Sequence, residues 1–181
     1  MKLEVIKGPT VEPVTAEEIK TYLHLDDTDV AEVTQLEAFI TAARMFCEEY
    51  QKIAYYPQIL KVIWARDEIH ETMELPRSVF FSKIINVTQT QANHHRTIQN
   101  YQVGCGQIYS QITFEEVPDG DVSVEYEVGK ENLQLEDVKV VIKLLVSSMY
   151  TNRLPYDASG KKLEEVPFGV RALLDRNKVI L

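Results

Sequence analysis

The sequence has 181 residues, of which 45% are hydrophobic and 26% are charged, and its formal net charge is −9 at pH 7. This composition is typical of a folded globular protein and excludes a wholly disordered chain. The negative charge argues against a protein that grips phosphate backbones or anionic membranes, because both need clustered lysine and arginine. No uninterrupted apolar run approaches the roughly 18 residues of a membrane span, and the two isolated cysteines predict free thiols in a reducing cytosol. We therefore expect a soluble intracellular protein.

The first third of the chain predicts a helical hairpin. Residues 1–14 form a short extended lead-in, and Thr15 and Glu18 then have the spacing of a capping box, which predicts the start of a short helix. An acidic turn leads into a long helix over residues 29–52 that neither glycine nor proline interrupts. Its apolar residues recur every three or four positions and form one stripe: Val33, Leu36, Ile40, Ala43, Cys47 and Tyr50. This helix is roughly 35 Å long, and we expect the rest of the chain to pack against it.

The middle third changes to the period of β-strands. The segments 58–66 and 84–91 are rich in β-branched residues, and 99–103 and 107–114 predict two further strands. Over residues 122–128, valine and tyrosine alternate with serine and glutamate, which is typical of a strand with one buried face. These segments predict a small antiparallel sheet of about four to six strands.

The last third returns to the helical period. We expect a helix over residues 136–153, with acids at its start and Arg153 at its end, as the helix dipole favours. The face expected in the core consists of Val138, Val141, Ile142, Leu145 and Met149. Val140 and Leu144 form a second apolar face. A helix that is apolar on two sides is either central in a core or shared with another subunit. A polar loop and a short terminal helix that begins at Pro167 follow.

Together these elements predict an α+β fold in which a helical core carries an inserted small antiparallel β-sheet. The core would contain the long central helix, the helix hairpin and the C-terminal helices. The expected division is an N-terminal helix hairpin at residues 1–56, a β-rich insertion at 57–130, and C-terminal helices at 131–181 that complete the helical core.

Few residues have a pattern that indicates catalysis or metal binding. His94 and His95 are neighbours between two strand patterns, where adjacent side chains point to opposite faces and seldom bind one metal ion. Cys105 lies between two glycines, without a base at a motif position. The acidic turn before the long helix lacks the spacing of a calcium loop, and the glycine-rich phosphate loop is absent. We predict no catalytic, cofactor or metal site. The alternative is a small metal- or thiol-dependent enzyme that uses His94, His95 or Cys105.

A series of short motifs follows a fixed order along nearly the whole chain. The first group consists of Pro13, Val14, Thr15, Glu17, Glu18, Asp26, Asp27, Asp29, Glu48 or Glu49, and Tyr50. The middle group consists of Leu75, Pro76 and Arg77 before the strand at 84–91, and of a Val-x-Val-x-Tyr-x-x-Gly pattern at 122–129. The last group consists of Tyr150, Asn152, Arg153, Val166, Pro167, Gly169, Val170, Leu173 and Leu174. This order resembles the head–tail connector proteins of tailed bacteriophages, a family of adaptor and head-completion proteins.

The resemblance implies a structural, non-enzymatic protein of a phage or prophage. Such proteins form a ring of about a dozen subunits between the portal protein and the tail-completion proteins. The genome passes through this ring without specific binding. The resemblance thus implies a homo-oligomer of the virion neck, assembled in the cytoplasm of a bacterial host, with no cofactor and no membrane contact. Such a ring can form on its own or can need the portal for its assembly, so the resemblance allows an isolated chain to be monomeric. Another phage neck or tail-completion protein with a similar helical frame is a further alternative.

The same resemblance directs attention to two sets of surface residues. Val140, Leu144 and Arg153 are expected at the contact with neighbouring subunits, because a ring subunit needs apolar surface left over for its neighbours. Glu48 and Glu49 are candidates for the lumen or a partner surface, since acids on a conduit wall would repel DNA and let it slide.

Overall fold

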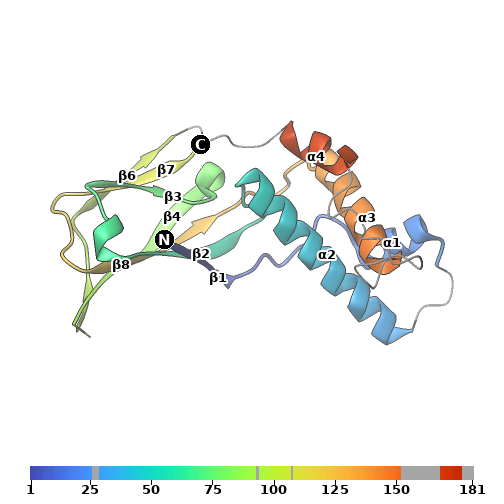
Figure 1. Cartoon of the computed structure of the whole chain (residues 1–181), viewed down its shortest axis with the longest axis horizontal. Coiled ribbons are helices and arrows are strands. Elements are labelled where there is room, and N and C mark those ends of the chain that lie inside the picture. The colour runs from blue at the N-terminus through green and yellow to red at the C-terminus, as the bar shows by residue number, and fades with distance from the viewer. Residues whose placement is uncertain (26–28, 93, 107, 152–167, 177–181) are drawn as a thin grey trace. The chain divides into compact units, whose positions relative to one another are not determined.

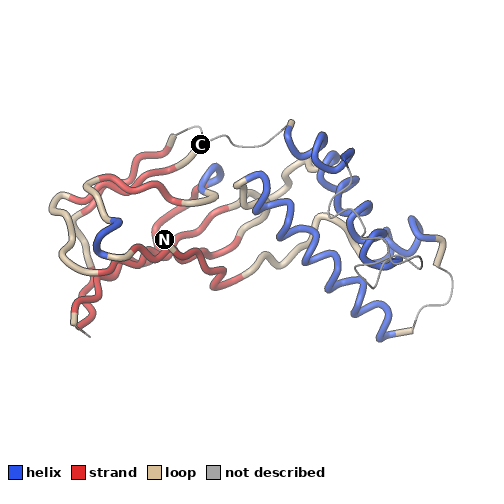
Figure 2. The backbone as a smooth tube through the Cα atoms, in the orientation of Figure 1, coloured by secondary structure: helices blue, strands red, loops and turns tan. Residues whose placement is uncertain are grey.

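The computed structural model describes residues 1–25, 29–92, 94–106, 108–151 and 168–176. The chain divides into two compact units, each built from two separate stretches of sequence. We call residues 1–10 and 52–133 the β unit, and residues 11–51 and 134–181 the helical unit. Figure 1 colours the elements in chain order, and Figure 2 shows that the β unit consists mainly of strands whereas the helical unit consists of helices.

The β unit contains two antiparallel sheets, with eight strands among the described residues. The first sheet has the strand order β1 (Lys2–Lys7), β2 (Gln58–Trp64), β8 (Asp121–Val128), β4 (Phe81–Gln91) and β5 (His94–Thr97). The second sheet has the order β3 (Thr72–Leu75), β7 (Ser110–Phe114) and β6 (Tyr101–Cys105). Two short 3-10 helices, η1 (Arg66–Glu68) and η2 (Ser78–Phe80), precede β3 and β4.

The buried faces of the two sheets form one hydrophobic core. Buried and half-buried residues alternate along β2, as the period of two requires. Leu60 of β2 lies opposite Tyr126 of β8 on the buried face. On the other face, Lys61 lies opposite Glu125 and forms a 3.1 Å ion pair with it. The second sheet contributes Met73, Leu75, Ile112 and Phe114 to the same core. The alternation that predicts the strand at 122–128 therefore separates a buried apolar face from a charged one.

A glycine is required where the chain leaves β8. Gly129 has a φ of 96°, and a Cβ atom at this position would lie 2.0 Å from the carbonyl oxygen of Tyr56. The N–H of Gly129 donates to the carbonyl oxygen of Phe80 at 2.8 Å. Any other residue would therefore strain the backbone and collide with a neighbouring carbonyl group.

The helical unit contains four helices among the described residues: α1 (Ala16–Leu23), α2 (Val30–Gln51), α3 (Glu136–Thr151) and α4 (Phe168–Asp175). The predicted capping box is confirmed, because the Thr15 hydroxyl accepts from the N–H of Glu18 and the Glu18 carboxylate accepts from the N–H of Thr15. The predicted long helix is also confirmed. Four members of its apolar stripe are fully buried: Leu36, Ile40, Ala43 and Cys47.

The β-sheet structure is larger than the sequence predicts. Instead of a small sheet inserted between helices, the described strands form a unit of two sheets with its own core. Residues 1–14 are predicted as an extended lead-in, but Lys2–Lys7 pair with β2 as an edge strand. Lys2 and Glu4 place charges on this edge, which protects it from pairing with other chains and also obscures the hydrophobic pattern of a strand.

Candidate functional site

The outer face of α3 bears the apolar residues that the sequence places on a second face. Val140 is 51% exposed, and Leu144 one turn later is half-buried. The opposite side of α3 is buried through Val138, Val141, Ile142, Leu145 and Val146. Met149, also expected inside, is half-buried. Arg153, the third predicted interface residue, lies outside the described residues.

The outer face of α3 begins with a charged residue and continues with uncharged ones. Glu136 is exposed at its start, but the positions that continue the face are the uncharged Val140, Leu144, Ser147 and Thr151. The lysines beside this face are held by carboxylates: Lys139 pairs with Glu136 at 3.1 Å, and Lys143 pairs with Glu18 of α1 at 3.7 Å. The result is a strip of uncharged surface about 17 Å long.

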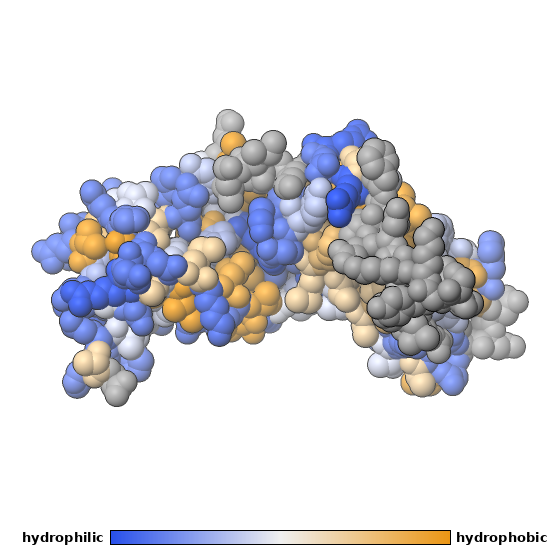
Figure 3. Space-filling view, in the orientation of Figure 1, coloured by the Kyte–Doolittle hydropathy of each residue, from blue (hydrophilic) through white to orange (hydrophobic). Residues whose placement is uncertain are grey.

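A second uncharged surface lies on α2, and sequence reasoning missed it. The exposed positions are Ala31, Thr34, Gln35, Ala38, Ala42 and Met45. They recur at spacings of three and four residues and so form one face of the helix. Met45 is 49% exposed, and the next exposed residue on this face is Glu49. Figure 3 shows pale orange, weakly hydrophobic residues along the middle of α2. We call this surface the outer face of α2.

The two predicted lumen residues have different environments. Glu49 is exposed, whereas only 1% of Glu48 is exposed. The Glu48 carboxylate accepts from the Arg44 guanidinium at 2.7 Å, one helical turn earlier. Glu48 is therefore not a surface residue of the isolated chain, and its burial does not suit a residue of the lumen or of a partner surface. The sequence alone did not separate the two acids because they are adjacent, and only one of them shares the buried stripe of Cys47 and Gln51.

Arg44 is the centre of a buried ionic cluster in the helical unit. Its Nε atom donates to Glu12 at 2.8 Å and its guanidinium also binds Glu48, while the Thr41 hydroxyl donates to Glu12 at 2.9 Å. Arg44 is 5% exposed. The sequence contained a signal for this ion pair, because Arg44 and Glu48 are four residues apart on the predicted helix. Arg44 also directly follows Ala43 of the apolar stripe. Through Glu12, the cluster links the segment before α1 to Thr41 and Arg44 of α2.

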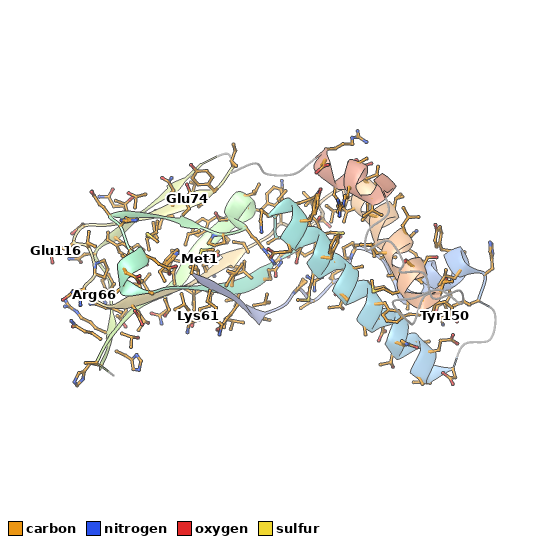
Figure 4. All side chains as sticks on the ribbon, viewed as in Figure 1. Met1, Lys61, Arg66, Glu74, Glu116 and Tyr150 are labelled. Atoms are coloured by element: carbon orange, nitrogen blue, oxygen red, sulfur yellow. The ribbon has the colours of Figure 1, made fainter. Side chains whose placement is uncertain are left out.

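Polar contacts also fix α3 and α4 against α2. The Tyr150 hydroxyl, near the end of α3, donates to Glu32 near the start of α2, and Figure 4 labels this tyrosine. The Gln51 amide, which is buried, donates to the carbonyl oxygen of Leu174 at 2.8 Å. The Tyr50 hydroxyl donates to Asp175 at 2.8 Å, and this hydrogen bond raises the pKa of Tyr50. These hydrogen bonds fix the positions of α2, α3 and α4 relative to one another, and with them the outer faces of α2 and α3.

The residues considered for enzymatic chemistry are not brought together. His94 and His95 are exposed on β5, where the His95 ring nitrogen lies 3.0 Å from the Thr90 hydroxyl. Cys105 is exposed on β6 and lines a hollow of about 400 Å³, and the described residues around this hollow include no histidine. Within the described part of the chain, no three side chains of histidine, cysteine, aspartate or glutamate gather as a metal site. Likewise, none of the described helices has the length and apolarity needed to cross a membrane.

Comparison with known proteins gives matches only among solved structures, since no protein-family model and no curated protein matches the chain. One matching chain belongs to the neck of an empty GTA particle, computed with C6 symmetry; its identity to this sequence is 18% and the TM-score is 0.71. The alignment covers 100% of this chain and 97% of the other. The protein has the fold of a neck protein.

Two further neck and virion structures support this likeness. A chain in the virion of the native gene transfer agent (GTA) particle also has 18% identity and a TM-score of 0.71. A chain in the neck of the native GTA particle, computed with C12 symmetry, has 17% identity and a TM-score of 0.59. Both alignments cover 100% of this chain and 97% of the other. The resemblance to a phage connector-type protein, predicted from short motifs, is therefore confirmed at the level of the fold over the whole chain.

Proposed function

We propose that this protein is a head–tail connector subunit, a structural virion-assembly protein that forms a ring between a portal protein and tail-completion proteins. The observation that carries the proposal is the fold likeness to a GTA neck chain, which extends over 100% of this chain. Structures of that neck were computed with C6 and C12 symmetry. A subunit of the same fold in a ring of about a dozen copies is consistent with those symmetries.

The surface of the helical unit supports assembly rather than catalysis. The outer face of α2 is exposed, that of α3 is exposed or half-buried, and both are uncharged, although 26% of the sequence is charged. Solvated helix faces normally carry charged side chains, so uncharged faces favour contact with another protein surface. We propose Val140 and Leu144, together with Arg153, as residues at the contact with a neighbouring subunit.

The charge of the chain supports a conduit through which DNA passes without binding. Twelve copies with a formal charge of −9 each would form a strongly acidic ring. We propose the exposed Glu49 as a residue of the lumen or of a partner surface. Carboxylates there would repel the phosphate backbone and would keep the genome from adhering to the wall.

The proposal places the protein in the virion neck, after assembly in the cytoplasm of the bacterial host that carries the phage or prophage. It requires no cofactor and no membrane. The test is to mix the purified chain with portal rings of the same particle and to image the products by electron microscopy. We expect an added ring of density on the tail-facing end of the portal. Binding only to isolated tails would instead assign the protein to tail completion, and no binding to either would contradict a neck function.

A further inference from the structure

The two uncharged faces of the helical unit lie on opposite sides of one helix pair. Each helix has its buried residues on one side and uncharged residues on the other, which are exposed on α2 and exposed or half-buried on α3. The helices α2 and α3 pack against each other through their buried sides, and the hydrogen bond between Tyr150 and Glu32 links them. The outer face of α2 and the outer face of α3 therefore point away from each other.

The two faces also match in length and chemistry. The outer face of α2 extends from Ala31 to Met45, about 21 Å, and the outer face of α3 extends from Val140 to Thr151, about 17 Å. Alanine and threonine occupy four of the six positions on the outer face of α2, and serine and threonine occupy two of the four on the outer face of α3. Such small side chains allow helix axes to approach to about 8 Å. The larger side chains, Met45 on one face and Leu144 on the other, can fill the grooves between them.

We infer that the outer face of α2 is the docking surface for the outer face of α3 of a second copy of this chain. This inference rests on the proposed ring and names its contact. Two dissimilar complementary faces on opposite sides of one unit make a head-to-tail contact, which produces a closed ring when the rotation between copies closes. Contact through like faces would produce only a two-fold dimer, so the opposed arrangement is the one that a ring requires.

The charge distribution explains why these faces, and not others, would meet. Copies that each carry a formal charge of −9 repel one another, and a contact through acidic surfaces would bury like charges. A contact between the two outer faces would bury no like charges, because both faces are uncharged over three to four helical turns. A single contact of this kind is small, roughly below 1,200 Å² in total, so it is weak alone. It would become stable when the ring closes or when a portal holds several copies together.

Cross-linking tests the contact directly. The background variant Cys105→Ser removes the exposed thiol, since Cys47 is buried. In this background, the test variant combines Ala42→Cys with Val140→Cys. The control combines Val140→Cys with Glu37→Cys, because Glu37 is exposed on α2 but lies outside the outer face of α2. With a short bis-maleimide linker and portal rings, we expect a ladder of covalent oligomers from the first pair and at least about tenfold less from the control.

A charge substitution provides a second readout that does not depend on reactive thiols. Ala42→Glu places a carboxylate on the outer face of α2, and Ala42→Gln adds nearly the same volume without charge. Both residues form helices well, so both variants should fold. We expect Ala42→Glu to raise the concentration needed for ring assembly about tenfold or more, because an unpaired charge would be desolvated at every contact. Ala42→Gln should raise it less than about threefold.

The outcomes separate this contact from the connector function. Suppose that the Cys105→Ser background assembles on portals, but the Ala42–Val140 pair cross-links no better than the control and Ala42→Glu assembles as well as Ala42→Gln. The pairing of these faces is then wrong, while the connector function stands. Cross-links found only within single chains would also overturn the pairing. If the background chain never assembles on a portal, the proposed function fails and the pairing fails with it.

Discussion

Arg44→Ala would remove the cation that lies between two carboxylates inside the helical unit. The Arg44 side chain is 6% exposed, that of Glu48 is 1% exposed and that of Glu12 is 29% exposed. The two ion pairs measure 2.8 Å to Glu12 and 2.7 Å to Glu48. After the substitution, the buried Glu48 carboxylate loses the Arg44 guanidinium, while the more exposed Glu12 can regain water. The cost should therefore arise mainly from Glu48.

The expected loss is about 3 kcal/mol, because removing one partner of a buried ion pair typically costs about 3–5 kcal/mol and Glu12 can be rehydrated. A domain has only about 5–15 kcal/mol of stability, so this loss is large. Replacing both partners by apolar residues of similar volume should cost far less. For Arg44→Met combined with Glu48→Met, we expect a loss of about 1 kcal/mol or less, since no carboxylate remains buried without the guanidinium.

Urea unfolding followed by far-UV circular dichroism measures this loss. All described α-helices belong to the helical unit, so the helical signal reports on it, whereas the fluorescence of Trp64, the single tryptophan, reports on the β unit. Lys143→Ala is the control, because its pair with Glu18 is 3.7 Å long and partly exposed and should contribute less than about 0.5 kcal/mol. A loss below about 1 kcal/mol for Arg44→Ala, or an equal loss for the double variant, would refute the reasoning.

Three further predictions concern the turn after β8, the thiols and the first helix. Gly129→Ala should destabilise the chain by at least about 2 kcal/mol in urea unfolding, since φ is positive and a Cβ would meet a carbonyl oxygen, whereas Gly104→Ala, with open space, should stay within about 0.5 kcal/mol. Burial raises the pKa of Cys47 to about 12, so at pH 8 its thiol should stay protonated. A thiol reagent should therefore titrate only the exposed Cys105 quickly in the native chain, and two fast thiols would contradict the structure. Thr15→Ala removes the hydroxyl of the capping box and should cost about 1 kcal/mol of helical stability by circular dichroism, and no change would show that the cap contributes little.

The helices were predictable because their signals are local and repeated. The capping box at Thr15 and the stripe from Leu36 to Cys47 each depend on spacing within one segment, and the structure confirms both. The second apolar face of α3 was predictable for the same reason, since Val140 and Leu144 are one turn apart. Such spacing shows which residues share a face of a helix. It was enough to predict the outer face of α3, but not the outer face of α2.

The rest could not be predicted because it depends on contacts between distant segments. Residues 2–7 pair with β2, more than fifty positions later, and nothing in their own pattern indicates that partner. The burial of Glu48, but not of Glu49, depends on Arg44 and on Glu12 from the segment before α1. Apart from Met45, the outer face of α2 consists of alanine, threonine and glutamine, residues that fit either a buried or an exposed position. Its exposure became evident only when the packing of α2 was known.

The most direct test of the connector assignment is the mass of the assembly. The purified chain, measured by light scattering over a range of concentrations with and without the portal ring of the same particle, should assemble into a complex of about a dozen copies, either alone or on the portal. A chain that stays monomeric under both conditions, at concentrations where portal rings are intact, would contradict the connector function. The next measurement would then be elemental analysis for a metal bound near His94 and His95.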